Sequence, residues 1–278
     1  MNLQSPKKFK MMVDQAHEVA LNVLRPISRK YDKAEHAYPK ELDMLASLID
    51  GMNEGGEGIN AGAAVGKRGE TETGNKNGNN MSTALGIIEM CYGDTGLLLS
   101  MPRQGLGNSA IAAVANDEQL ERFKGTWAAM AITEPGCGSD SAAIRTTATQ
   151  DGDEYILNGE KIFVTSGDRA DSVVVWATLD KKLGRAAIKS FVVPKGTAGM
   201  KVERLEHKLG IKASDTAVIS FIDCRVPAAN LLGNPEIDVA KGFAGVMETF
   251  DNTRPLVAAM AIGCAKASLE RIKEIFKD

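Results

Sequence analysis

The sequence lacks the features that mark a secreted, membrane-spanning or metal-binding protein. No apolar run approaches the roughly 20 residues of a membrane-spanning helix, and residues 1–8 carry no hydrophobic signal segment. Four widely spaced cysteines form no C-x-x-C pair and no Cys/His group: Cys91, Cys137, Cys224 and Cys264. We therefore expect free, mostly buried thiols in a cytoplasmic protein without a membrane span, a disulfide framework or a zinc site.

Histidine and excess charge are also scarce. His17, His36 and His207 lie far apart along the chain, so we expect surface histidines and no metal ligands. The 33 basic and 36 acidic residues leave a net charge of −3, which gives no reason to expect nucleic acid or an anionic membrane as a partner. An anionic ligand would need a locally basic site.

What is present is a normal globular mixture, with 44% hydrophobic and 25% charged residues in a chain of 278. Helical spacing is found over 6–35 and 41–49, and it returns from Met81 to Phe123. Between Gly51 and Asn80 there are nine glycines and hardly a large apolar residue. Such a segment cannot bury enough surface to offset its ordering entropy, which predicts a long mobile loop.

One motif in the helical region suggests a different fold. Gly105-Leu-Gly107-Asn-Ser-Ala110 matches G-x-G-x-x-A, the dinucleotide-binding fingerprint. That reading would need alternating parallel strands and helices afterwards, and the next hundred residues instead show β-hairpin patterns. We therefore interpret these glycines as helix-packing and turn positions.

The pattern changes to strands between Trp127 and Leu232. Asp151-Gly152 and Asn158-Gly159 each separate short apolar segments, and such pairs favour tight hairpins. Further strands are expected at 172–178, 188–193 and 218–222. After Pro235 helical spacing resumes at 236–250, and Pro255 either begins a second helix or kinks one long helix.

These patterns predict an α+β multidomain protein. Its parts are a helical domain over 1–126, a central antiparallel β-barrel or sandwich over 127–235, and the start of a carboxyl-terminal helical bundle over 236–278. The apolar stripe of the last helix is expected to need a covering partner.

The octapeptide Thr133-Glu-Pro-Gly-Cys-Gly-Ser-Asp140 follows an apolar strand and contains two glycines and a proline. A loop of this kind can turn several backbone N–H groups toward one anionic or flavin oxygen. Three more motifs follow it at 153–167, 208–216 and 250–255. In this order the four motifs resemble the acyl-CoA dehydrogenases, FAD-dependent flavoenzymes that oxidise acyl-CoA thioesters to 2,3-enoyl-CoA.

The resemblance implies two loops that hold FAD. The residues that match the family's flavin contacts are Met130, Ile132, Thr133, Gly138 and Ser139 in the first loop and Phe163, Val164 and Thr165 in the second. Thr133 and Thr165 would donate hydrogen bonds to ring heteroatoms of the flavin, including N5. Phe163 stands where the family often has tryptophan, and its ring would still stack on the flavin.

The resemblance also implies a thioester site formed by Ser139, Asp251, Thr253 and Arg254. Lys212 and Ser214-Asp215-Thr216 match a segment on the coenzyme A side, but a polar turn explains them equally well. Most of the family carries its catalytic glutamate beyond the position of residue 278, and a minority carries it at the position of Thr253. Threonine cannot remove the α proton, so we expect no catalytic base in residues 1–278.

Three readings remain open. The first is an acyl-CoA dehydrogenase of fatty acid β-oxidation, complete only with a further domain or chain, which passes electrons to an electron-transfer flavoprotein and forms homo- or hetero-oligomers. The second is an acyl-CoA oxidase or flavin monooxygenase relative. The third is a non-catalytic assembly subunit of the same fold.

Overall fold

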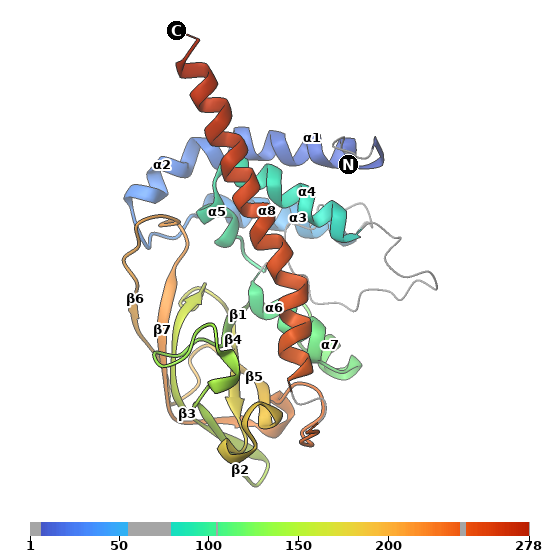
Figure 1. Cartoon of the computed structure of the whole chain (residues 1–278), viewed down its shortest axis with the longest axis vertical. Helices are drawn as coiled ribbons and strands as arrows, with labels where there is room; N and C mark the ends of the chain where they lie inside the picture. The colour runs from blue at the N-terminus through green and yellow to red at the C-terminus, as the bar shows by residue number, and fades with distance from the viewer. Residues whose placement is uncertain (1–6, 55–78, 104, 240–242, 278) are drawn as a thin grey trace.

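The computed structural model describes residues 7–54, 79–103, 105–239 and 243–277. Figure 1 shows a group of helices above, a curled sheet below, and one long helix that runs from the sheet past the helices. The amino-terminal helices are α1 (Lys10–Val19), α2 (Arg25–Lys33), α3 (Glu41–Glu54), α4 (Asn79–Gly93), α5 (Thr95–Leu99), α6 (Leu106–Val114) and α7 (Asp117–Arg122), with a π-helical turn at Ala20–Leu24 between α1 and α2.

The amino-terminal helices form where their spacing predicts, and side-chain caps mark where α5 and α7 begin. Asp94 accepts a hydrogen bond from the Leu97 amide at the start of α5, and Asn116 forms a capping box with Gln119 on α7. Helices occupy both ends of the segment predicted as a glycine-rich loop, since α3 extends to Glu54 and α4 begins at Asn79. The rest of that expected loop, 55–78, lies outside the described residues.

The β part is a single seven-stranded sheet in the order β1-β4-β2-β3-β7-β6, with β5 paired to β4. Its strands are β1 (Ala128–Ala131), β2 (Thr147–Asp151), β3 (Glu154–Thr165), β4 (Ser172–Thr178), β5 (Ile188–Pro194), β6 (Met200–Leu205) and β7 (Thr216–Pro227). Most pairs are antiparallel as predicted, but β1 and β2 each pair with β4 in parallel, so the sheet is mixed. The strand β6 was not predicted.

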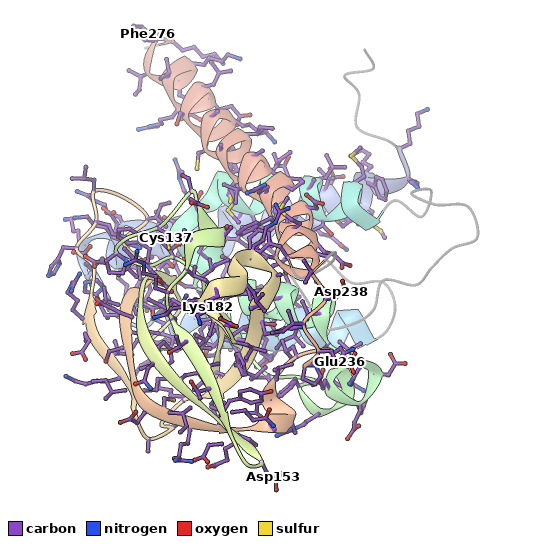
Figure 2. The ribbon with its side chains drawn as sticks, turned by 60° about the horizontal axis from the view of Figure 1, so that its bottom comes forward. Cys137, Asp153, Lys182, Glu236, Asp238 and Phe276 are labelled. Carbon is purple, nitrogen blue, oxygen red and sulfur yellow. The ribbon has the colours of Figure 1, made fainter. Side chains whose placement is uncertain are left out.

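One predicted hairpin is wrong. The turn after Asp151 joins β2 to β3 as expected, and Figure 2 shows Asp153 at its tip. By contrast, Asn158-Gly159 lies inside β3, with a bulge against β7 between Leu157 and Gly159. A Cβ atom on Gly159 would lie 2.4 Å from Oγ1 of Thr146, so glycine is required here by close packing.

The G-x-G motif packs a helix against the sheet. Built Cβ atoms on Gly105 and Gly107 would lie 2.1 Å and 2.2 Å from the carbonyl oxygens of Ala128 and Ala129. The glycines thus allow α6 to lie directly on β1, as the packing interpretation expects.

The long helix α8 (Ala244–Ile275) is continuous and contains Pro255. It begins at Ala244 rather than at Glu236, and it packs on α4 and α6 (Figure 1). Large apolar side chains remain exposed along it and at its C-cap, namely Met247, Val257, Ile262, Leu269, Ile272, Ile275 and Phe276. No helix within the described ranges is long and apolar enough to cross a membrane. The predicted domain limits stay predictions.

Candidate flavin and thioester site

The two motif segments expected to hold the flavin lie side by side. The Ile162 amide of β3 donates a hydrogen bond to the carbonyl of Thr133, at 2.9 Å, just beyond the end of β1. The Lys161 ammonium donates to the Ile132 carbonyl at 3.0 Å. The sheet therefore curls until the end of β1 meets β3, and it joins the loop that begins at Thr133 to the strand end that contains Phe163.

A buried carboxylate holds the first loop in place. Glu134 is 7% exposed and Lys161 is fully buried, and their charged atoms are 2.7 Å apart. Glu134 also accepts hydrogen bonds from Thr146, through both its amide (2.9 Å) and its hydroxyl (2.6 Å), and from the Arg145 amide (2.7 Å). The loop after β1 is thus tied to β3 and to the segment before β2.

Each member of this pair favours the ionised form of the other. Burial acts to raise the pKa of Glu134, but the Lys161 charge and the hydrogen bonds outweigh it, and the pKa lies below its usual value. Burial lowers the pKa of Lys161 to about 8, against the attraction of Glu134. A carboxylate so fully engaged serves to position the loop rather than to exchange protons.

The predicted flavin residues differ in their exposure. Gly138 and Ser139 are exposed, and Met130, Thr133 and Thr165 are half-buried. Within the described residues, no hydrogen-bond partner is found for the hydroxyl of Thr133 or Thr165, so both are available to a ligand. Figure 2 shows Cys137, in the same loop, at the opposite end of the β part from the Asp153 turn.

Three further predicted residues contribute in different ways. Phe163 is 61% exposed and adopts φ +58°, a strained value for an aromatic residue. Val164 is fully buried in the sheet core, and Ile132 is buried in a second cluster. The side chains of Val164 and Ile132 are therefore part of the core, and only their backbone groups remain to contact a ligand.

The predicted thioester residues of α8 are split between two faces. Asp251 and Arg254 are exposed, and the Arg254 guanidinium lies 4.5 Å from the centre of the Phe250 ring. Thr253 is buried, and its hydroxyl donates to the Thr249 carbonyl at 3.0 Å. Val246 and Phe250 belong to the same apolar cluster as Met130 and Ile132, which links the start of α8 to the first loop.

The 208–216 segment has a structural role that the sequence did not reveal. Asp215 is fully buried and pairs with Arg169, whose Nε is 3.3 Å away. Arg169 also donates to the carbonyls of Ala37 (2.9 Å) and Ala213 (2.9 Å). The Arg169 guanidinium thus connects Asp215 at the sheet to the segment after α2. The interpretation of Asp215 as part of a polar turn did not predict this contact.

Sequence reasoning also missed the Glu134–Lys161 pair. A signal was available, because Lys161 occupies an inward position of the alternating pattern in β3, where an apolar residue is expected. A charged residue at such a position requires a buried partner, but the sequence does not say which acid supplies it.

Comparison with known proteins agrees with this geometry. The family model described as "Acyl-CoA dehydrogenase, middle domain" matches residues 129–224. The short-chain specific acyl-CoA dehydrogenase of Clostridium acetobutylicum is 30% identical over the whole chain and 70% of its own length. The butyryl-CoA dehydrogenase structure from Megasphaera elsdenii has a TM-score of 0.78 at 30% identity, covering 99% of this chain and 70% of that one. The chain belongs to the acyl-CoA dehydrogenase family.

Two further similar proteins carry different names. The acryloyl-CoA reductase (NADH) of Anaerotignum propionicum is 33% identical over 97% of this chain and 66% of its own length. A chain from a structure described as "Electron transferring flavoprotein of Acidaminococcus fermentans" is 33% identical, covers 97% and 68% of the two chains, and has a TM-score of 0.74. The chain thus spans about two thirds of the length of these relatives, from 66 to 70%.

Proposed function

We propose that this chain forms the FAD-binding and thioester-binding part of an acyl-CoA dehydrogenase that oxidises a short-chain acyl-CoA to its 2,3-enoyl-CoA, a step of fatty acid β-oxidation. The observation that carries the proposal is the junction of the loop after β1 with the end of β3, made by the Ile162 amide and the Thr133 carbonyl. The names of the relatives support the short-chain substrate.

In this proposal FAD lies across the junction. Bound FAD would accept the β hydrogen as hydride. The residues assigned to it are Met130, Ile132, Thr133, Gly138, Ser139, Phe163, Val164 and Thr165, with Ile132 and Val164 contributing backbone groups. The free hydroxyls of Thr133 and Thr165 suit hydrogen bonding to flavin heteroatoms, and such preorganised donors stabilise negative charge that develops on the ring.

The thioester is assigned to Ser139, Asp251 and Arg254, which are exposed. Thr253 contributes to helix packing and not to catalysis, because its hydroxyl is buried and bonded to Thr249. No base is assigned in this chain, since Glu134 is committed to Lys161 and to Thr146. The carboxylate that removes the α proton is proposed to come from a further segment or a partner subunit.

Electrons are proposed to pass to an electron-transfer flavoprotein, which the similarity to a chain from such a structure supports. An oligomer is proposed because α8 exposes apolar side chains along its length. A cytoplasmic location stays a prediction from the sequence.

The first experiment is to purify the tag-free chain and titrate it with FAD, following flavin fluorescence and visible absorbance. We expect one FAD per chain, with at least about tenfold weaker binding in Thr133→Ala and Thr165→Ala if each loses a charge-stabilising hydrogen bond. Thr149→Ala, at an exposed strand position, is the matched control and should bind as wild type. Absence of FAD binding in the wild type would contradict the proposal and favour the assembly-subunit reading.

A second candidate is the reverse reaction, reduction of a 2-enoyl-CoA, which the relative named acryloyl-CoA reductase (NADH) favours. Assays of the FAD-loaded chain, together with the segment or subunit proposed to supply the base, distinguish the dehydrogenase reaction from the reductase reaction. Bleaching of the flavin by butyryl-CoA, with an artificial acceptor preferred over dioxygen, indicates the dehydrogenase. Reoxidation of reduced flavin by an enoyl-CoA indicates the reductase, and rapid turnover with dioxygen indicates the oxidase relative.

A further inference from the structure

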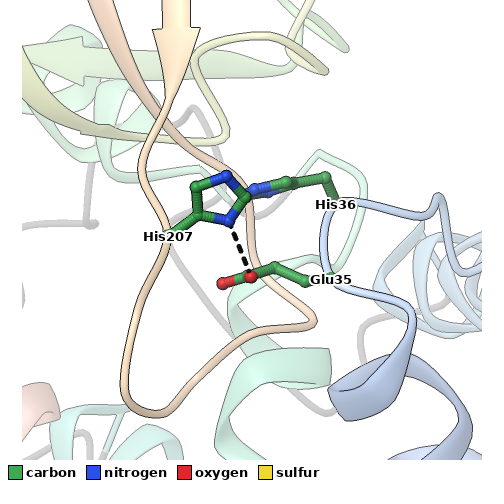
Figure 3. A group of neighbouring side chains, drawn as sticks. All are labelled: Glu35, His36 and His207. Atoms are coloured by element: carbon green, nitrogen blue, oxygen red, sulfur yellow. Dashed lines mark hydrogen bonds and ion pairs between the residues drawn. The ribbon is translucent and has the colours of Figure 1, made fainter.

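Two histidines that are distant in the sequence meet a glutamate at the junction of the helical part with the sheet. Glu35 and His36 follow α2, and His207 follows β6. The His207 Nδ1 lies 3.0 Å from a Glu35 carboxylate oxygen. The centroids of the His36 and His207 rings are 5.3 Å apart. Figure 3 shows the three side chains converging. His207 is exposed, as expected of a surface histidine, but the ring nitrogens of His36 are shielded from solvent, and the fold brings together two histidines that lie far apart in the sequence.

The three side chains are the right chemistry for a transition metal. One ligand atom from each lies within 4.8 Å of the others. Around a tetrahedral zinc ion, with bonds of about 2.0 to 2.1 Å, ligand atoms are roughly 3.3 Å apart. The cluster would need to close by at most about 1.5 Å. The His207 side chain is 85% exposed and can rotate to do so.

His36 supplies an independent observation. Both of its ring nitrogens are shielded from solvent, and neither has a hydrogen-bond partner within the described part of the chain. Shielding a polar atom without a partner is unfavourable, and His36 is also held at φ +70°, a conformation that costs backbone energy. A metal ion at this position would satisfy one of those nitrogens.

The Glu35 carboxylate is held in place by a backbone group. The Lys208 amide bonds the second carboxylate oxygen at 2.9 Å, an outer contact that would orient a ligand. The Lys208 ammonium is turned away, to the Ser214 carbonyl and the Thr216 hydroxyl.

We propose that Glu35, His36 and His207 bind one divalent transition-metal ion of the zinc type, which joins the end of α2 to the loop between β6 and β7. The fourth position is left to water or an exogenous ligand, as in other sites with three protein ligands. The ion would add a second connection between the helical part and the sheet. The first is made by Arg169, which donates to the His36 carbonyl at 3.3 Å. The alternative is a plain His–Glu ion pair.

The test uses the tag-free full chain, stripped with a chelator and titrated with zinc chloride, with cobalt(II) as a spectroscopic substitute. We expect one zinc ion per chain, a higher melting temperature that the chelator reverses, and tetrahedral cobalt absorption. His207→Ala removes an exposed ligand, and His36→Asn keeps a residue type that accepts positive φ. Each variant should remain folded by circular dichroism and bind zinc at least about tenfold more weakly.

His17 provides a matched control within the same chain. It forms a comparable pair with Glu89, at 2.8 Å, but the described residues offer it no second histidine to complete a metal site. His17→Ala should therefore leave zinc affinity unchanged. The proposal is overturned if the wild type binds no stoichiometric zinc, if His207→Ala and His36→Asn bind it as wild type, or if His17→Ala weakens it equally.

Discussion

The Lys161 ammonium lies 2.7 Å from the Glu134 carboxylate, and the two side chains are 0% and 7% exposed. Lys161 belongs to β3 and Glu134 to the loop after β1, so the pair holds together the two segments proposed to bind FAD. In a buried pair the loss of one partner leaves the other charge unsolvated, which costs more than the pair itself contributes.

We therefore expect Glu134→Gln to lower the free energy of unfolding by about 3 to 5 kcal/mol and to weaken FAD binding. Urea unfolding and FAD titration measure the two effects. Asp14→Asn removes a partner from the exposed pair of Lys10 and Asp14, and it should change stability by less than about 1 kcal/mol. Equal losses of unfolding free energy in the two variants would show that the buried pair stabilises the fold no more than an exposed pair does.

Gly107→Ala should push α6 away from β1. Its Cβ would lie 2.2 Å from the Ala129 carbonyl oxygen, and overpacking of this kind costs about 1 to 3 kcal/mol, which exceeds the gain in helix propensity of roughly 1 kcal/mol. Gly210→Ala is the control, because a Cβ there meets no atom within 4 Å. Thermal unfolding of both variants measures the difference, and a melting temperature of Gly107→Ala at or above wild type would contradict the packing argument.

Arg169→Lys should loosen the junction between the helical part and the sheet. Lysine keeps the charge but cannot reach Ala37, Ala213 and Asp215 together, as the guanidinium fork does. Loss of one such charged hydrogen bond is expected to cost about 1.5 to 3 kcal/mol in urea unfolding.

The matched control for this substitution is Arg225→Lys. Arg225 is half exposed and pairs with Asp151 and Glu154 at the surface, so its replacement should cost less than about 1 kcal/mol. An Arg169→Lys variant as stable as Arg225→Lys would refute the fastening role.

Glu41 should contribute stability that depends on pH. Hydrogen bonds from Lys30 and Tyr31 lower the pKa of Glu41 from 4.5 to about 2. A carboxyl group with a depressed folded pKa stabilises the protein fully above its unfolded pKa, and that contribution is lost as the pH falls from 4.5 toward 2. The stability advantage of wild type over Glu41→Gln should thus shrink across this window. An advantage that is constant over the same pH range would argue against the pKa shift.

Phe163 is expected to contact the flavin without supporting the fold. Aromatic contacts contribute about 0.5 to 1.5 kcal/mol beyond area burial, so Phe163→Ala should weaken FAD binding roughly 2- to 12-fold and leave the melting temperature nearly unchanged. Phe163→Trp should bind more tightly. Ile222→Ala, at another exposed apolar position of the sheet, should affect neither property. A large fall in stability without a change in FAD affinity would assign Phe163 to the fold.

Local patterns were sufficient for most helices and strands, because their spacing and caps act over a few residues. They failed where a distant segment decided the outcome. Asn158-Gly159 reads as a turn, but the approach of Thr146 and the pairing with β7 keep β3 extended through it. Pro255 lies inside one helix because α8 packs along α4 and α6.

The sequence by itself determined the family motifs, the α+β order of elements, and the residues proposed for FAD and the thioester. Each of these can be recognised from short local segments of the chain. Only the tertiary structure decided which distant polar residues come into contact. Lys161 lies against Glu134, Asp215 against Arg169, and His207 beside His36, because the curled sheet and its junction with the helices bring these residues together. Burial makes the first two contacts energetically important, and no sequence spacing encodes burial.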